Sequence, residues 1–334
     1  MTRHGATKGI KGVTGVTALR NKYGSFSTVS AGSGGGGGVA GYVAGGVDSG
    51  AISGIDKITF LADTKTTLSA TLTTARHLVA GFANSGVAGY AAGGSDSGGR
   101  VSGIDKVSFP ADTKTTLSAT LTTARYWPAG FANSGVAGYA AGGNDSGGNT
   151  SGIDKVSFPA DSKTTLSATL TSARSLATGF ANSGTAGYSA GGTTSGYISG
   201  IDKVSFAADT VTTLSATLTT INAYPAGFAN SGTAGYVAGG QGVSSVNIEG
   251  IDKVSFPADT KTTLSATLTT RRYVQAGFAN SGTAGYSAGG EDIFTGNLSG
   301  IDKITFPADT KTTLSATLTT ARQQLAGFAD SGTL

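Results

Sequence analysis

A segment of about 49 residues recurs along most of the chain. Its clearest marker is a tyrosine followed after two residues by a pair of glycines, as in AGYVAGG at 40–46. The marker tyrosines are Tyr42, Tyr90, Tyr139, Tyr188, Tyr236 and Tyr286. Repeats of this period predict a propeller or a similar array, because each unit buries its apolar face only against its neighbours.

Each unit contains four stretches with strand character. In the unit at 77–125 these stretches are 78–84, 87–94, 104–109 and 115–121. Turn-forming Gly, Ser, Asn and Asp separate them. The last stretch alternates, with Leu117, Ala119 and Leu121 expected on one face. A helix is excluded because Gly and β-branched Thr are too frequent. The unit is therefore predicted to be a four-stranded antiparallel blade.

The two ends of the repeat array are complementary. The first unit begins at its second strand (38–46), and the chain finishes with a first strand alone (321–334). Pairing these two fragments completes one blade and leaves no open edge between the first and last blades. We therefore expect an all-β, six-bladed propeller over residues 39–334, closed by the C-terminal strand.

The repeats resemble the kelch repeat in order and spacing. Apolar residues lead into Gly-Gly, then follow a variable loop, a strand, an Asp-Thr turn, another strand and an Arg that opens the next unit. The resemblance covers about residues 39–334. The tryptophan usual in the fourth kelch strand is absent here, and Leu68 and Leu117 are expected to replace its packing. Propellers serve unrelated functions, so the resemblance implies a fold and not an activity.

Residues 1–38 precede the repeats and differ from them in composition. They carry Arg3, Lys8, Lys11, Arg20 and Lys22 and no acidic residue, whereas the rest of the chain is nearly neutral. They contain few large apolar residues, so no separate core is expected. The glycine run at 32–38 lacks the Gly-Lys-Ser/Thr of a phosphate-binding loop and is typical of a linker. We expect a basic attachment arm, and no binding of nucleic acid by the chain as a whole.

The composition argues against several chemistries. The chain has no cysteine and two histidines, which leaves no thiolate site and nearly excludes a histidine-built metal site or triad. No blade gathers acids, bases and nucleophiles, so we expect no catalytic residues, no cofactor and no enzymatic activity. No apolar run is long enough to span a bilayer, and no membrane insertion is expected.

Two segments of each unit differ between copies while the rest scarcely changes. One follows Gly-Gly: 47–53, 95–102, 144–151, 193–199, 241–249 and 291–299. The other follows the position where most units have an Arg, before the next unit begins: 77–80, 126–129, 175–178, 223–226, 273–276 and 323–326. In an antiparallel meander both belong to the same end of the blade, so both are expected on one face.

This face is either a binding surface or a set of loops that drift freely. Aromatic residues gather in it, and exposed Tyr and Trp are favoured at interfaces, which supports binding. The candidate binding residues are Tyr126, Trp127, Tyr197, Tyr224, Tyr273, His77, Phe294 and Arg272.

Two charged patterns each admit a functional and a structural interpretation. Five units have Arg where the next unit begins (Arg76, Arg125, Arg174, Arg272 and Arg322), and the remaining unit has Asn222. These arginines either form a ring that grips anions or pair with the repeated Asp of GIDK, and the fixed spacing favours the pair. Asp48, Asp96 and Asp145 in the loops could bind calcium, but one carboxylate per loop favours Asx turns, and no metal is expected.

The amino-acid sequence of the units also resembles kelch-like repeats in structural and tail-fibre proteins of tailed bacteriophages. That resemblance implies a multi-copy virion protein at the particle surface, docked to capsid or tail proteins through residues 1–38. The variable segments would then bind a host-surface glycan or receptor, with Tyr126, Trp127, Tyr224 and Tyr273 as stacking platforms. The alternative is a cellular kelch-type scaffold that binds a protein or a glycan through the same face.

Overall fold

The computed structural model describes residues 19–20, 26–27 and 40–330 of the chain. The chain divides into two units, residues 1–37 and 38–334. In the first unit, β1 (Leu19–Arg20) and β2 (Phe26–Ser27) pair antiparallel, with Leu19 opposite Ser27. The remainder of the predicted arm, and with it the predicted docking function, lies outside the described residues.

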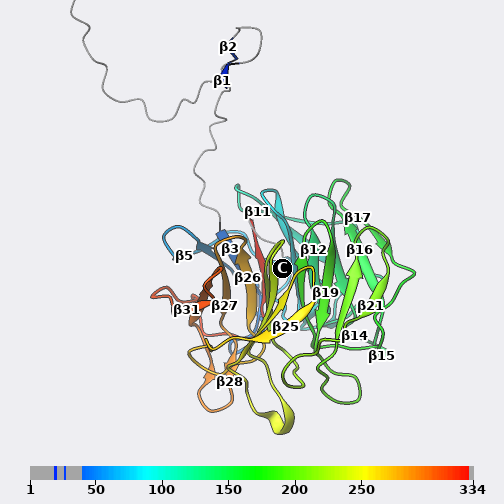
Figure 1. The fold of residues 1–334 in the computed structure, drawn as a ribbon. Helices are drawn as coiled ribbons and strands as arrows, with labels where there is room; N and C mark the ends of the chain where they lie inside the picture. Colours follow the sequence, from blue (N-terminus) through cyan, green and yellow to red (C-terminus); the bar gives the residue numbers. More distant parts are fainter. Residues whose placement is uncertain (1–18, 21–25, 28–39, 331–334) are drawn as a thin grey trace, which may run out of the picture. The chain divides into compact units, whose positions relative to one another are not determined.

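Residues 40–330 form six four-stranded antiparallel sheets, the blades of a propeller (Figure 1). We number the blades 1 to 6 in the chain order of their second strands. The innermost strands, from blade 1 to blade 6, are β32 (Ala326–Ala329), β6 (Ala80–Asn84), β12 (Ala129–Asn133), β18 (Thr178–Asn182), β22 (Ala226–Asn230) and β26 (Ala276–Asn280). The second strands are β3 (Ala40–Ala44), β7 (Ala88–Ala92), β13 (Ala137–Ala141), β19 (Ala186–Ala190), β23 (Ala234–Ala238) and β27 (Ala284–Ala288).

The outer half of each blade holds the third and fourth strands. The third strands are β4 (Ile55–Thr59), β10 (Ile104–Ser108), β16 (Ile153–Ser157), β20 (Ile201–Ser205), β24 (Ile251–Ser255) and β30 (Ile301–Thr305). The fourth are β5 (Thr64–Thr67), β11 (Thr113–Thr116), β17 (Ser162–Thr165), β21 (Val211–Thr213), β25 (Thr260–Thr263) and β31 (Thr310–Thr313).

Short elements decorate the loops after the second strands. Three are two-residue hairpins: β8 (Ser95–Asp96) with β9 (Gly99–Arg100), β14 (Asn144–Asp145) with β15 (Gly148–Asn149), and β28 (Glu291–Asp292) with β29 (Gly296–Asn297). Blade 5 has instead a single turn of 3₁₀ helix, η1 (Val243–Ser245). Figure 1 shows β14, β15 and β28 on the same side of the propeller.

The predicted closure of the ring is confirmed. β32, from the end of the chain, pairs antiparallel with β3, and Tyr42 lies opposite Phe328. Blade 1 is therefore built from both ends of the repeat array, and no open strand edge separates it from blades 2 and 6.

The fourth strand lies earlier in each unit than predicted. In blade 2 it spans Thr113–Thr116 rather than 115–121, because the chain leaves the ladder after Thr116 pairs with Asp105. In the rest of the predicted stretch, up to Leu121, only the amides of Leu117 and Leu121 bond to the start of the third strand and the segment before it, at Ile104 and Ser102. The predicted alternation survives without a strand, since Leu121 is buried and Ser118 is exposed. The expected packing by leucine is also present, with Leu68 and Leu117 partly buried against the core.

Stacks of three aromatic rings join neighbouring blades. In blade 2, Phe82 and Tyr90 stack at 5.3 Å between ring centroids, and Phe158 of blade 3 stacks on Tyr90 at 5.1 Å. Equivalent Phe and Tyr residues form such a stack in every blade. The glycine directly before each marker tyrosine makes room for the Phe ring of the preceding blade, because a Cβ on Gly138 would lie 2.0 Å from the Phe82 ring.

Ion pairs cross the same junctions. Each Lys of the GIDK segment bonds to the Asp of the turn before the fourth strand of the next blade, as Lys106 does with Asp161 at 2.6 Å. The six pairs run around the ring: Lys57–Asp112, Lys106–Asp161, Lys155–Asp209, Lys203–Asp259, Lys253–Asp309 and Lys303–Asp63. Sequence analysis did not predict these pairs, which join blades electrostatically where the aromatic stacks join them by packing.

A ring of glycines lines the axis. Each innermost strand carries one glycine, and a Cβ there would lie 2.0 to 2.2 Å from the carbonyl oxygen of the glycine in the preceding blade. The glycines are Gly81, Gly130, Gly179, Gly227, Gly277 and Gly327. The absence of side chains brings the innermost strands close together and keeps the central channel narrow.

Candidate functional site

The two variable segments of each blade meet, as predicted. The residue after the Arg position pairs through a backbone bridge with the residue after Gly-Gly in every blade. The bridges are Val47–Gln323, His77–Ser95, Tyr126–Asn144, Ser175–Thr193, Ala223–Gln241 and Tyr273–Glu291. Both sets of variable residues therefore lie on one side of the propeller, which we call the variable face.

The glycine pair that precedes each loop forces this meeting. In blade 2, Gly93 and Gly94 have φ of 67° and 101°, conformations that side chains rarely adopt. A Cβ on Gly94 would also lie 2.5 Å from the carbonyl oxygen of His77. The repeated Gly-Gly is thus a structural turn, as its period predicted, and not a phosphate-binding loop.

One residue of each blade forms the mouth of the channel on this face. These residues are Leu78, Trp127, Leu176, Tyr224, Val274 and Gln324, and all have left-handed backbone, with φ between 52° and 62°. Each such residue costs about 1 kcal/mol or more. Hydrogen bonds between these residues partly offset that cost. At five of the six junctions around the ring, the backbone amide of one mouth residue donates to the carbonyl of the mouth residue in a neighbouring blade, as Trp127 N–H does to Leu78 O at 2.9 Å.

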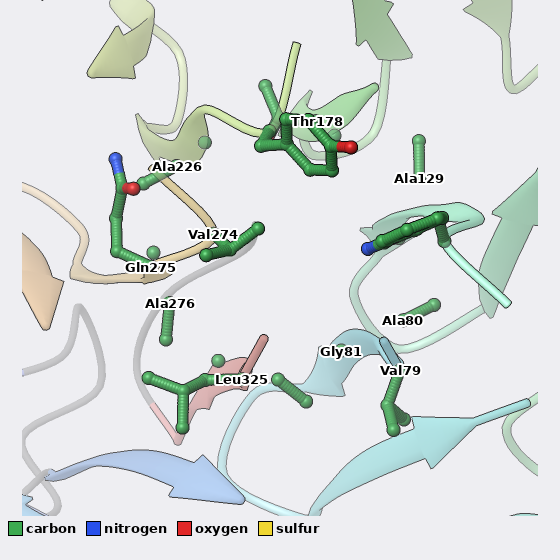
Figure 2. A pocket seen from close by; sticks show the side chains of 18 of the residues that line it. Val79, Ala80, Gly81, Ala129, Thr178, Ala226, Val274, Gln275, Ala276 and Leu325 are labelled. Atoms are coloured by element: carbon green, nitrogen blue, oxygen red, sulfur yellow. The ribbon is translucent and has the colours of Figure 1, made fainter. Parts of the chain in front are cut away.

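Behind the mouth lies a cavity of about 100 Å³. Four consecutive residues of every blade line it, ending in the alanine or threonine and the glycine of the innermost strand. Figure 2 shows the small side chains of Ala80, Ala129, Ala226 and Ala276 around the opening, with Val274 and Leu325 beside them. The deep wall is therefore uniform, and the differences between blades are confined to the mouth.

Five aromatic side chains form a connected cluster at this mouth. Trp127 lies edge-to-face with Tyr126 at 4.9 Å and with Tyr224 at 5.4 Å between ring centroids. Tyr224 in turn contacts Tyr273 at 5.7 Å and Tyr197 at 6.4 Å, both nearly perpendicular. We call these five residues the aromatic cluster. It unites candidate residues from blades 3, 4, 5 and 6, and all five side chains are half-buried.

Polar groups hold the outer members of the cluster in place. The Tyr197 hydroxyl donates to Gln241 Oε1 and the Tyr273 hydroxyl to Glu291 Oε2, both at 2.8 Å. On the other side, Arg100 donates to the Tyr126 hydroxyl at 3.2 Å and stands 4.6 Å from its ring centroid. These bonds restrict the rings, so little side-chain freedom remains to be lost when a ligand binds.

The two central members keep unused hydrogen-bonding groups. Within the described residues, the Trp127 indole N–H and the Tyr224 hydroxyl have no hydrogen-bond partner. Burial, together with the neighbouring Tyr197 and Tyr126, raises the pKa of Tyr224 to about 12. The hydroxyl is therefore neutral at physiological pH and can both donate and accept.

The remaining candidate residues lie outside the cluster. His77 lines a separate recess with Asp96, and burial lowers its pKa. Phe294 is 75% exposed, with the Arg271 guanidinium 5.5 Å from its ring centroid. Arg272 is only 2% exposed and bonds to Asp302 and to the carbonyls of Gly289 and Gly300, so its guanidinium is not part of the surface.

The repeated arginines form the structural pairs that their spacing favoured. The pairs are Arg76–Asp105, Arg125–Asp154, Arg174–Asp202, Arg272–Asp302 and Arg322–Asp56, with N–O distances of 2.8 to 3.4 Å. Burial lowers the pKa of each of these arginines, and the partner carboxylate opposes that shift. They hold the blade together and do not form an anion-binding ring.

The loop aspartates make Asx turns. Asp96 Oδ1 accepts the amide of Gly98 and Asp145 Oδ1 that of Gly147, both at 2.8 Å, and Asp48 accepts from Ser49 and Gly50 in the same way. Within the described part of the chain, no three His, Asp or Glu side chains are grouped as metal ligands. No helix there is long and apolar enough to cross a membrane.

No protein-family model matches the sequence, and a search of curated proteins finds no similar one. The geometry of the site thus supplies the evidence for function.

Sequence reasoning missed part of the mouth. Leu78, Leu176, Val274 and Gln324 were not singled out, although each stands at the same place in its unit as Trp127. Their shared position in the repeat was the signal that could have identified them. The left-handed backbone could not, because no residue type indicates that a large side chain takes this conformation. Gln241 and Glu291, which fix two of the tyrosines, were missed because their role depends on contacts between blades.

Proposed function

We propose that the protein is a non-enzymatic binding module whose aromatic cluster binds a glycan at the mouth of the propeller channel. The observation that carries this proposal is the connected set of half-buried rings, drawn from four blades onto one face. Sugar rings present apolar C–H faces, which pack on aromatic side chains, and hydroxyls that need polar partners at the edge.

The polar groups around the cluster suit hydroxyl ligands. Trp127 Nε1 and the Tyr224 hydroxyl lie within the cluster without partners among the described residues, and Arg100, Gln241 and Glu291 stand at its edge. Cationic and anionic side chains occur singly there, which favours a ligand that is largely neutral. The narrow channel behind the mouth admits the end of a ligand, not a peptide segment, because only about 100 Å³ is free.

We further propose that the protein is displayed in multiple copies on a virion surface, joined to capsid or tail proteins through residues 1–38. The support for this part is the resemblance of the repeats to kelch-like phage structural proteins and the basic, glycine-rich composition of the arm. Co-purification of the full chain with virion proteins supports the placement. Incorporation of a chain lacking residues 1–38 into particles contradicts the docking role.

The glycan proposal is tested on an array of immobilised oligosaccharides that includes fragments of bacterial surface polysaccharide. Full-length protein is compared with the double variant Trp127→Ala, Tyr273→Ala. The proposal predicts binding to a restricted set of glycans and at least a tenfold loss in the double variant, equivalent to about 1.4 kcal/mol. Phe294→Ala is the matched control, because Phe294 is exposed on the same face and has no ring contact with the cluster.

Three outcomes decide the matter. Loss in the double variant with retention in the control supports the proposal. Glycan binding that survives in the double variant overturns the assignment of the site. Binding of a soluble cellular protein with no glycan bound favours the alternative, a kelch-type protein scaffold that uses the same face.

A further inference from the structure

Blade 5 lacks the arginine that the other five blades bury. In blade 2, Arg76 NH1 donates to Gly103 O at 3.1 Å, and NH2 donates to Ala91 O at 2.9 Å and to Asp105 Oδ2 at 3.0 Å. These three acceptors surround one guanidinium from two sides. In blade 5 the equivalent acceptors are Gly250 O, Val237 O and Asp252 Oδ2, and the residue at the arginine position is Asn222.

Asn222 does not replace the missing guanidinium. Its amide Nδ2 reaches only Gly239 O, at 2.7 Å. Its Oδ1 is buried without a hydrogen-bond partner among the described residues, although the residue is only 5% exposed. Among the residues that the structure describes, Asp252 Oδ2 keeps a single hydrogen-bond partner, the Thr219 amide at 2.7 Å. The shorter side chain has therefore left Asn222 Oδ1 without a donor and Asp252 Oδ2 without the guanidinium donor that its counterparts have, in a site built for an arginine.

The carboxylate of blade 5 has become accessible. The Asp252 side chain is 11% exposed, whereas the paired aspartates of the other blades are exposed by no more than 1%. Lys261 approaches Asp252 Oδ1 at 3.7 Å, as equivalent lysines do in blades 1 to 3, so it does not compensate for the missing arginine. Leaving one member of a buried ion pair without its partner is costly, which favours recruitment of a cation.

A second substitution makes the same place more acidic. In blade 2 the pair Arg76–Asp105 borders a recess that is open to solvent and is also lined by Ser102. Blade 5 has Glu249 at the position of Ser102, where every other blade has serine, and Glu249 is exposed. Blade 5 has thus lost a positive charge inside the site and gained a negative charge at its entrance.

We propose that blade 5 contains a guanidinium-binding site, formed by Asp252 Oδ2, Gly250 O and Val237 O, with Glu249 at its entrance. The ligand class is a guanidinium group, because the same three acceptors hold one in blade 2 and a rounded ammonium would not reach them together. The site does not depend on the proposed glycan site, since it uses none of the aromatic cluster.

One residue of the chain competes with this proposal. Arg271 stands where blades 2 and 3 have Ala75 and Ala124, and the latter lines the recess of blade 2. Its guanidinium lies over the Phe294 ring at 5.5 Å and makes no ion pair within the described residues. The experiment therefore includes the variant Arg271→Ala.

The test is the shift in Tm of the full chain with methylguanidinium chloride, measured against tetramethylammonium chloride at equal concentration. Tetramethylammonium carries the same charge but no N–H donor, so the difference isolates hydrogen-bonded binding. For a dissociation constant of about 10 mM, about 50 mM methylguanidinium raises Tm by about 2 °C over the control. Asn222→Arg fills the site as in the other blades and is expected to abolish the difference, and Asp252→Asn removes the charge and does the same.

Each further arm has a defined meaning. The peptide acetyl-Gly-Arg-Gly-amide is measured in the same way. If the peptide raises Tm as much as methylguanidinium does, the guanidinium comes from an arginine side chain of a partner. If methylguanidinium raises Tm and the peptide does not, the site is restricted to small free guanidinium compounds. Equal shifts in the wild type and Asn222→Arg overturn the proposal. A shift that appears only in Arg271→Ala also overturns it, because Arg271 then occupies the site itself.

Discussion

Tyrosine-to-phenylalanine substitutions at equivalent places in two blades test how the blades are joined. The Tyr90 hydroxyl donates to Asp161 Oδ1 in the next blade at 2.9 Å, beside the ion pair from Lys106 to the other oxygen. Four other marker tyrosines donate to the equivalent aspartate. Tyr139 is the exception: its hydroxyl is buried and bonds to no carboxylate.

The difference arises from the lysine of blade 3. Lys155 bonds to both oxygens of Asp209, at 2.8 and 3.1 Å, and so occupies the acceptor that a tyrosine uses elsewhere. Both substitutions leave the aromatic stack in place, because the phenyl ring is retained. Only the hydrogen bond to the carboxylate distinguishes them.

The expected magnitudes follow from that bond. A hydrogen bond to a charged group contributes about 1.5 to 3 kcal/mol, and the 30% exposure of the Asp161 side chain places this one at the lower end. Tyr90→Phe should therefore lower the free energy of unfolding by about 1.5 kcal/mol. Tyr139→Phe loses no such bond and should change it by less than about 0.5 kcal/mol. Urea denaturation of both variants measures the two values, and equal losses would refute the electrostatic account of the blade junctions.

Three further predictions concern packing, a buried charge and pH. Gly179→Ala should prevent folding or cost more than about 4 kcal/mol, because its Cβ would lie 2.0 Å from a carbonyl oxygen of the preceding blade, whereas Gly196→Ala, with open space around it, should cost less than about 0.5 kcal/mol in the same assay. Arg125→Met should lower the free energy of unfolding by about 3 to 5 kcal/mol by leaving buried Asp154 without its guanidinium partner, with only the more distant Lys163 at 3.8 Å, and a loss below about 1 kcal/mol would contradict the structural role. Burial beside two other tyrosines raises the pKa of Tyr224 to about 12, so the folded chain retains that proton longer than the unfolded chain. The free energy of unfolding should consequently fall between about pH 10 and pH 12, and Tyr224→Phe should reduce the fall, as followed by denaturation at several pH values.

Most of the fold could be predicted from the repeat, because the six copies share the same strand-like stretches and the same turn residues between them. The complementary ends at 38–46 and 321–334 predicted the closure, since only a completed blade leaves no edge. The fourth strand was misplaced because Leu117 to Leu121 alternate like a strand yet follow the third strand through only two backbone bonds. Alternation reports which face is buried and does not by itself report ladder pairing.

The candidate site was predictable to a smaller extent. Comparison between copies identified every member of the aromatic cluster, because the scaffold is so uniform that its exceptions stand out. It did not predict that Trp127 and Tyr224 meet, since they come from blades 3 and 5 and their contact follows from the ring geometry. It also placed Arg272 among the binding residues, where burial beside Asp302 makes it structural.

Fluorescence of Trp127 tests the central claim most directly, because it is the only tryptophan of the chain and lies within the aromatic cluster. Full-length protein is titrated with a glycan that it retains on the array, and the emission of this residue is followed without any substitution. The account predicts a saturable change in emission whose midpoint equals the dissociation constant from calorimetry. Saturable calorimetric binding with no change in Trp127 emission would place the glycan elsewhere and contradict the claim.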